Sequence, residues 1–251
     1  NNIIEYNYAE TATSGGQLDF VQCTSGGNHI FRYNTIIIKN TDGSAHCDGL
    51  QFYSPFTDGM TMQIYGNYIF QDNTKTTNAQ GIYIEGLVAG AMDNTDWIIY
   101  NNVLNLPYAK NGITIRNNNA RALIYSNTIY QGSSVASPGF WIQDDNNTSI
   151  DNIVVKNNIF YSTSASVSPV NIVETMGTGC EVTNNMIYSP MSSPIRYTGS
   201  LRSLATWNSY SFVVTDVANN PNFTNISAQD FSLQGGSPAI DAGTTLSAPY
   251  N

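Results

Sequence analysis

Apolar and polar residues alternate along most of the chain, in short runs that end on an asparagine and then resume with another apolar run. Examples are IIEYNY near the N-terminus and, further on, IFRYNT, QIYGNY and LIYSNT. Alternation at period two is typical of β-strands, and helical periodicity is absent. The asparagines that mark the phrase recur every 25 to 35 residues, at Asn7, Asn34, Asn67, Asn102, Asn127, Asn158 and Asn185.

Each period also contains a second alternating phrase, usually opened by glycine or proline, as in DGLQFYS, QGIYIEG, NGITIRN and PGFWIQD. Repeats of this length are typical of stacked supersecondary units. We therefore predict an all-β fold, a right-handed parallel β-helix (solenoid) of about seven coils. Stacking at about 4.8 Å per coil would bury one continuous core and line the asparagines up as a hydrogen-bonded ladder. The asparagines are then architectural.

These repeats resemble the secreted right-handed β-helix superfamily, which includes polysaccharide lyases, glycoside hydrolases and phage tailspike proteins. We expect the coils over residues 1–202 and an irregular closing segment of the same domain over residues 203–251. Part of that segment, NNPNFTNISAQDFSLQGGSPAIDAG, resembles the closing segment of secreted bacterial β-helix proteins. The resemblance implies a secreted or cell-surface protein of bacterial or phage-like origin. It assigns no role to any single residue.

Composition narrows the choice of ligands. The net charge is −9, from 9 basic and 18 acidic residues, and no basic cluster is visible, which argues against nucleic acid as a partner. No apolar run is long enough to cross a membrane as a helix. Repeats begin at the first residue, so the sequence reads as a piece of a longer chain. Nothing in it specifies an oligomeric state.

Alternation sorts the second phrase into inward and outward side chains. Aromatic Tyr53, Tyr83 and Trp141 would face outward between amides such as Gln51 and Gln143, a combination that suits stacking and hydrogen bonding of sugars. An ordinary strand surface is the alternative. The two predicted outward columns are Asp19, Gln51, Tyr83, Thr114, Trp141, Asn171 and Arg196, and Val21, Tyr53, Glu85, Arg116, Gln143, Val173 and Thr198.

Glu85 and Arg116 are neighbours in one column, about 5 Å apart on adjacent coils. They form either a simple cross-strand ion pair or part of a lyase site, in which Arg116 neutralises a uronate carboxylate. The candidate bases for such a site are Tyr83, Lys39 and His46.

Asp144 and Glu174 share a turn column at about 5 Å, which suits a retaining glycosidase, whereas Glu85 and Asp144, about 10 Å apart, approach the inverting range. Asp144, Asp145 and Glu174 would also suit calcium, which prefers oxygen ligands. Solvated turn residues are the remaining alternative. The sequence specifies no other cofactor.

The stretch HCDGLQ places His46 and Asp48 directly before a predicted outward-facing strand. The pair would act as a base and its orienting carboxylate, or bind a metal; a structural histidine is the alternative. We predict a secreted protein that binds a polysaccharide along this face and cleaves it as a lyase or a hydrolase. A non-catalytic glycan-binding, adhesin or spike-type β-helix is the competing hypothesis.

Overall fold

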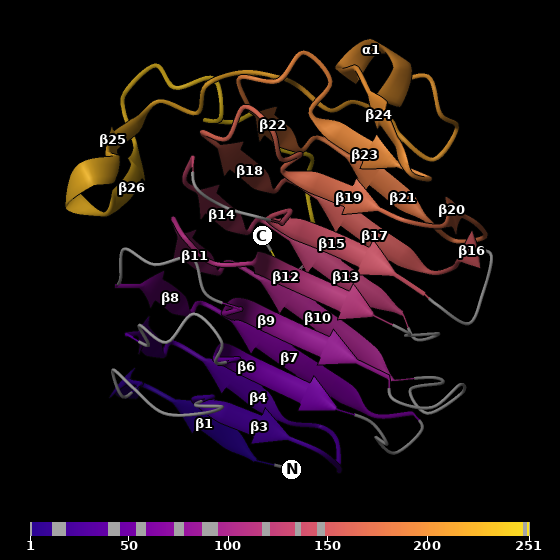
Figure 1. Ribbon diagram of the computed structural model, residues 1–251. Coiled ribbons are helices and arrows are strands. Elements are labelled where there is room, and N and C mark those ends of the chain that lie inside the picture. The colour runs from indigo at the N-terminus through magenta and orange to yellow at the C-terminus, as the bar shows by residue number, and fades with distance from the viewer. Residues whose placement is uncertain are drawn as a thin grey trace.

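The chain forms an all-β solenoid in a computed structural model that describes residues 2–11, 19–39, 46–53, 59–72, 78–86, 95–116, 121–133, 137–144, 149–247 and 250 (Figure 1). Three parallel sheets run side by side along one axis, and each coil adds one strand to each sheet. The chain winds in a right-handed sense, as parallel crossover connections do. The predicted parallel β-helix is therefore confirmed.

The three sheets are built as follows. The first sheet contains β1 (Ile3–Glu5), β4 (Ile30–Arg32), β7 (Thr61–Tyr65), β10 (Asp96–Tyr100), β13 (Ala122–Tyr125), β17 (Ile153–Lys156) and β21 (Glu181–Thr183). The second contains β2 (Tyr8–Glu10), β5 (Thr35–Ile38), β8 (Tyr68–Gln71), β11 (Val103–Leu106), β14 (Thr128–Gln131), β18 (Ile159–Ser162) and β22 (Met186–Tyr188). The third contains β3 (Val21–Cys23), β6 (Asp48–Tyr53), β9 (Gln80–Glu85), β12 (Asn111–Arg116), β15 (Phe140–Gln143), β19 (Val170–Ile172), β23 (Ile195–Tyr197) and the antiparallel β24 (Ser200–Arg202).

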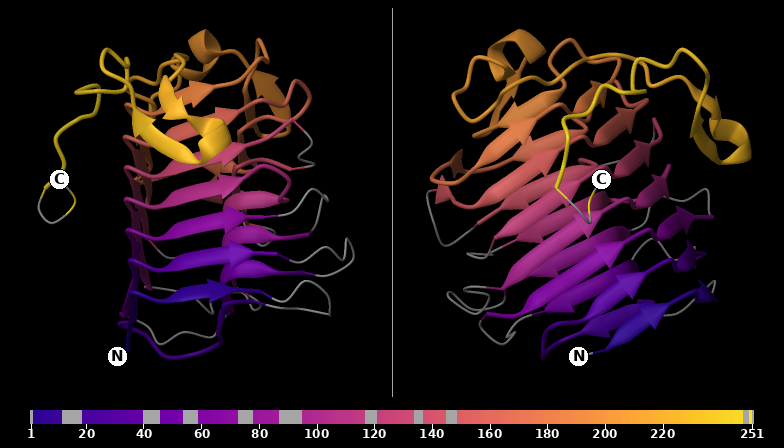
Figure 2. Two further views of the ribbon diagram at one scale, coloured as in Figure 1. Left: turned by 90° about the vertical axis from the view of Figure 1, so that its left-hand side faces the viewer. Right: turned by 180° about the vertical axis from the view of Figure 1, so that it is seen from behind.

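A closing segment covers the C-terminal end of the stack and then turns back along its outside (Figure 2). It contains α1 (Leu204–Trp207), the hairpin strands β25 (Phe223–Asn225) and β26 (Asp230–Leu233), and the short 3-10 helix η1 (Ile226–Ala228). Within the coils, β16 (Ser149–Ile150) and β20 (Thr175–Met176) form a small extra sheet. Near the end of the segment, Leu246 and Tyr250 pack against Tyr100 and Tyr125 on the first sheet.

Aliphatic and aromatic side chains from all three sheets fill the interior. Phe52 lies edge-on to Phe31 and to Trp97, with ring centroids 5.2 and 5.3 Å apart, and all three side chains are buried. Each coil alone would leave this surface exposed to water, so the core exists only through stacking.

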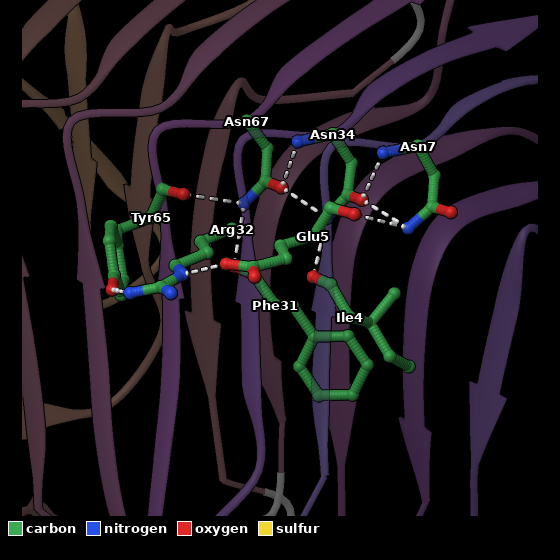
Figure 3. Close-up of polar contacts among 8 residues, drawn as sticks. All are labelled: Ile4, Glu5, Asn7, Phe31, Arg32, Asn34, Tyr65 and Asn67. Atoms are coloured by element: carbon green, nitrogen blue, oxygen red, sulfur yellow. Dashed lines mark hydrogen bonds and ion pairs between the residues drawn. The ribbon is translucent and has the colours of Figure 1, made fainter.

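The predicted asparagine ladder is confirmed at the corner between the first and second sheets (Figure 3). The Asn34 side-chain nitrogen donates to the Asn67 side-chain oxygen at 2.9 Å and to the Ile4 carbonyl at 3.0 Å. The same contact passes from coil to coil up to Asn185, which donates to Asp216 Oδ1 at 3.0 Å. Because the side chains after Asn7 are buried, these bonds satisfy amides that water cannot reach.

The register of the first coil differs from the prediction. Alternation placed Leu18 and Phe20 inward, but strand pairing aligns Val21 with Leu50 and Gln22 with Gln51. Val21 is therefore not an outward residue, Asp19 lies before the strand rather than in the column, and Leu18 lies outside the described residues. The segment LDFVQC alternates in more than one frame, and a shift by an odd number of residues exchanges the two faces.

A column of glycines explains why the second phrase so often opens with that residue. A Cβ on Gly81 would lie 2.7 Å from the Gly112 carbonyl oxygen and 2.5 Å from Leu104 Cδ2. Gly49 and Gly112 face the same restriction from the carbonyl of the next coil. The coils therefore pack too closely here for any side chain.

We expect Gly81→Ala to lower the free energy of unfolding by about 2 kcal/mol, because the added methyl group overpacks a rigid backbone contact. Urea unfolding followed by fluorescence would measure the change. Gly235→Ala is the matched control, since nothing lies within 4 Å of a Cβ at that position. Equal stability of the two variants would contradict the close-packing explanation.

Candidate functional site

Strand register brings most of the predicted outward residues together on the third sheet. Gln51, Tyr83, Thr114 and Trp141 pair in sequence along one column, and Tyr53, Glu85, Arg116 and Gln143 pair along the next. Paired residues on adjacent parallel strands are about 4.8 Å apart. From β6 to β15, both predicted columns are therefore present.

Tyr83, Glu85 and Arg116 form one connected cluster at the centre of this face. The Tyr83 hydroxyl donates to Glu85 Oε2 at 2.7 Å, and Arg116 Nη1 lies 3.2 Å from Glu85 Oε1. The Glu85 side chain is only 13% exposed, whereas that of Arg116 is 37% exposed. The carboxylate is thus held from two sides, while the guanidinium extends to the surface.

The burial of Tyr83 alters two predicted roles. Its side chain is buried, so its ring face is not offered to a sugar. Burial, reinforced by the hydrogen bond to Glu85, raises the pKa of Tyr83, which keeps the phenol protonated and makes it a poor base. Tyr53 is partly exposed and lies edge-on to Tyr83, with ring centroids 6.2 Å apart.

His46 adjoins the same cluster through Tyr83, with ring centroids 5.8 Å apart. Its Nε2 lies 3.0 Å from the Gln80 side-chain nitrogen, and its Nδ1 lies 3.5 Å from Asp48 Oδ2. Burial lowers the pKa of His46 and raises that of Asp48. Lys39, the other candidate base, is paired with Glu10 at 2.6 Å beside the second sheet and is not part of this cluster.

Gln51 and Asp48 are buried beneath the face rather than exposed on it. Gln51 donates to the Tyr53 hydroxyl at 2.8 Å, so it orients a surface aromatic rather than reaching a ligand directly. Its predicted outward direction is correct, but the surrounding side chains cover it.

The predicted acidic site further along the stack has a different geometry from the one expected. Asp144 is only 4% exposed, and the Glu174 carboxylate accepts a hydrogen bond from the Asp144 backbone N–H at 2.8 Å. Glu174 therefore binds the backbone of the preceding coil. Asp145, the third residue of the proposed calcium site, lies outside the described residues. Trp141 and Gln143 lie on β15, directly before Asp144, and are partly buried.

Sequence reasoning missed Gln80, which links the parts of the site. Besides its contact with His46, Gln80 accepts a hydrogen bond from the Thr114 hydroxyl at 2.9 Å. A signal was present, because polar residues precede the glycine of three successive phrases, at Asp48, Gln80 and Asn111. All three are buried and aligned in register.

A cavity of about 340 Å³ lies elsewhere, between the asparagine corner and the closing segment. Uncharged residues line it, among them Ser126, Asn157, Met186, Thr215 and Gly243. It would accommodate a small neutral molecule, but the described residues that line it include no titratable group for catalysis.

No helix in the described part of the chain is long and apolar enough to span a membrane. A scan of protein-family models gave no match to the chain, and neither did searches of curated proteins and of solved structures. The chemistry of the site is therefore inferred from its own residues.

Proposed function

We propose that the protein is a secreted or cell-surface polysaccharide lyase that binds an extended glycan along the third sheet. It would cleave the chain by β-elimination beside a uronic acid. A base takes the proton from the carbon next to the carboxylate, the electron pair forms a C=C bond, and the glycosidic C–O bond breaks, so that the departing sugar oxygen takes a proton from water. His46 is the candidate base beside Tyr83, because burial lowers its pKa and favours the neutral imidazole. The observation that carries this proposal is the in-register cluster of Tyr83, Glu85 and Arg116, in which a fixed carboxylate and phenol hold a surface guanidinium.

Elimination requires a cation that neutralises the uronate carboxylate and so makes the neighbouring C–H bond more acidic. A guanidinium suits this task, because it binds a planar carboxylate through two parallel hydrogen bonds. Arg116 is more than one-third exposed, so it can accept a second carboxylate while keeping its contact with Glu85. Tyr53, Trp141 and Gln143, on strands to either side, would contact neighbouring sugars.

Hydrolysis is supported less well. A glycosidase needs two carboxyl groups that flank the scissile bond and reach it. Glu85 meets that condition only in part, and its predicted partner Asp144 is almost completely buried.

The test is a panel of uronate-containing and neutral polysaccharides, assayed for reducing ends and for the ultraviolet absorbance of unsaturated uronates. A lyase gives both signals together. Reducing ends alone would replace the proposal with a hydrolase. Binding without either signal would favour the non-catalytic glycan-binding alternative.

We expect Arg116→Ala to lower kcat/KM on the active substrate about 100-fold or more, because the variant loses the fixed cation that neutralises the uronate carboxylate. Arg196→Ala is the matched control, since Arg196 lies on the same sheet and donates to the Gly199 carbonyl. Its activity should stay close to wild type. Equal losses in the two variants would show that Arg116 has no special role.

A further inference from the structure

Two carboxylates and an imidazole converge at the start of β3 and β6, beside the proposed glycan face. Asp19, His46 and Asp48 each offer one ligand atom, and these atoms all lie within 4.8 Å of one another. Asp19 comes from the first coil, and His46 and Asp48 come from the second. Stacking of the coils therefore assembles the cluster.

Backbone contacts fix both carboxylates in place. Asp19 Oδ1 accepts from the Asp48 backbone N–H at 2.7 Å, and Asp48 Oδ1 accepts from the Gln80 backbone N–H at 3.0 Å. Each aspartate thus uses one oxygen to bind the next coil. The second oxygen of Asp48 is not needed for that purpose.

That second oxygen is the unusual feature. Asp48 is 0% exposed, and its Oδ2 has no partner of good hydrogen-bond geometry among the residues that the structure describes. His46 Nδ1 lies 3.5 Å from it, which is beyond a normal hydrogen bond. Leaving a buried carboxylate oxygen unpartnered is costly, and a second carboxylate nearby adds repulsion.

We propose that Asp19, His46 and Asp48 bind one divalent metal ion of the zinc class, with Asp48 Oδ2 and His46 Nδ1 among its ligands. The ion would neutralise the buried carboxylate and relieve the repulsion between the two aspartates. A mixed set of imidazole and carboxylates suits Zn²⁺, whereas Ca²⁺ prefers oxygen ligands alone.

The surroundings of the cluster would need one adjustment to suit a metal centre. The Gln80 side-chain nitrogen lies 3.0 Å from His46 Nε2, which carries the ring proton when Nδ1 binds a metal, so the amide would have to turn its oxygen toward the ring and its nitrogen toward the Thr114 hydroxyl. The His46 side chain is 31% exposed, so the ion could enter from the surface. Three protein ligands would leave a coordination position open, as in catalytic zinc sites. This assignment does not rest on the proposed lyase activity. Because a metal-bound His46 cannot take a proton, the proposed elimination would use the metal-free protein.

The test uses protein labelled with ¹⁵N and free of a histidine tag. The chain has only two histidines, so the ring signals of each can be followed separately. Zn²⁺ is added stepwise while ring signals of both histidines are followed by long-range ¹H–¹⁵N spectra. We expect the His46 signals to shift and to saturate at one Zn²⁺ per chain. His29, which is buried and accepts a hydrogen bond from the Asn2 backbone, should not change.

Calorimetry on variants provides the second readout. His46→Gln and Asp48→Asn should weaken Zn²⁺ binding by about 10-fold or more, whereas the control His29→Gln should bind as the wild type does. Asp48→Asn keeps an oxygen for the Gln80 backbone, and circular dichroism would verify folding. An unchanged His46 signal at excess Zn²⁺, equal binding by His46→Gln and wild type, or binding of Ca²⁺ in place of Zn²⁺ would overturn the proposal.

Discussion

Replacing Asn102 with alanine should lower the free energy of unfolding by about 3 kcal/mol or more, because several buried groups lose their partners at once. Asn102 lies in the middle of the ladder and is 0% exposed. Its side-chain oxygen accepts from both the backbone and side-chain nitrogens of Asn67. Its side-chain nitrogen donates to Asn127 Oδ1 and to the Ile64 carbonyl, each at 2.9 Å.

Urea unfolding would measure this loss, with the fluorescence of buried Trp97 as a probe in the same coil. Asn7→Ala is the matched control at the exposed end of the ladder, where water can replace the lost partners. We expect that variant to lose less than about 1 kcal/mol. A similar loss at both positions would mean that the ladder contributes through local turn geometry rather than through buried hydrogen bonds.

The sequence predicted the ladder because its spacing is simple and its chemistry is local. Each asparagine occupies the same corner, and the residue before it often has a positive φ, as at Tyr33, Asn101 and Asn157. The corner therefore recurs whatever the length of the loops between phrases. The same argument placed Glu85 beside Arg116 correctly.

Burial on the third sheet was harder to predict. Alternation tells which way a side chain points, but not whether its neighbours cover it. Tyr83 and Gln51 point outward and are nevertheless buried, because they belong to a network with Glu85, Tyr53 and His46. The roles assigned to Tyr83 and Gln51 changed for this reason, although their positions did not.

The position of Asp19 depends on which set of alternating residues in one short segment faces the core. Alternation in LDFVQC placed Asp19 in the outward column, whereas the actual pairing puts it two residues before β3, where its carboxylate accepts from the Asp48 backbone N–H. Sequence alone gives no means to choose between the frames, because both bury apolar residues. Contacts with the next coil decide it.

The end of the ladder was also missed, and it carries the second large expected effect. Asp216 Oδ1 accepts from the Asn185 backbone nitrogen at 2.8 Å and from its side-chain nitrogen at 3.0 Å, and Asp216 Oδ2 accepts from Trp207 Nε1 at 2.8 Å. The side chain is 1% exposed. Asp216→Ala should therefore cost about 3 kcal/mol or more, since it leaves three buried donors without acceptors.

The same aspartate should give a measurable pH dependence. Burial is the main cause that raises the pKa of Asp216, so the folded chain keeps this proton at pH values where the unfolded chain has released it. Rising pH then favours the unfolded state, beginning near the ordinary aspartate pKa of about 4 and ending above the raised folded value. The contribution of Asp216 to stability is thus complete below that window and falls as pH increases through it.

Comparison of wild type with Asp216→Asn isolates this contribution, because the asparagine does not titrate while every other group is shared. We expect the difference in unfolding free energy, wild type minus variant, to decrease as the pH rises from about 4 toward neutrality. Urea titrations at several pH values would give the curve. A difference that increases with pH would mean that the three donors stabilise the carboxylate more than burial destabilises it, and that the ladder ends on a charged acceptor.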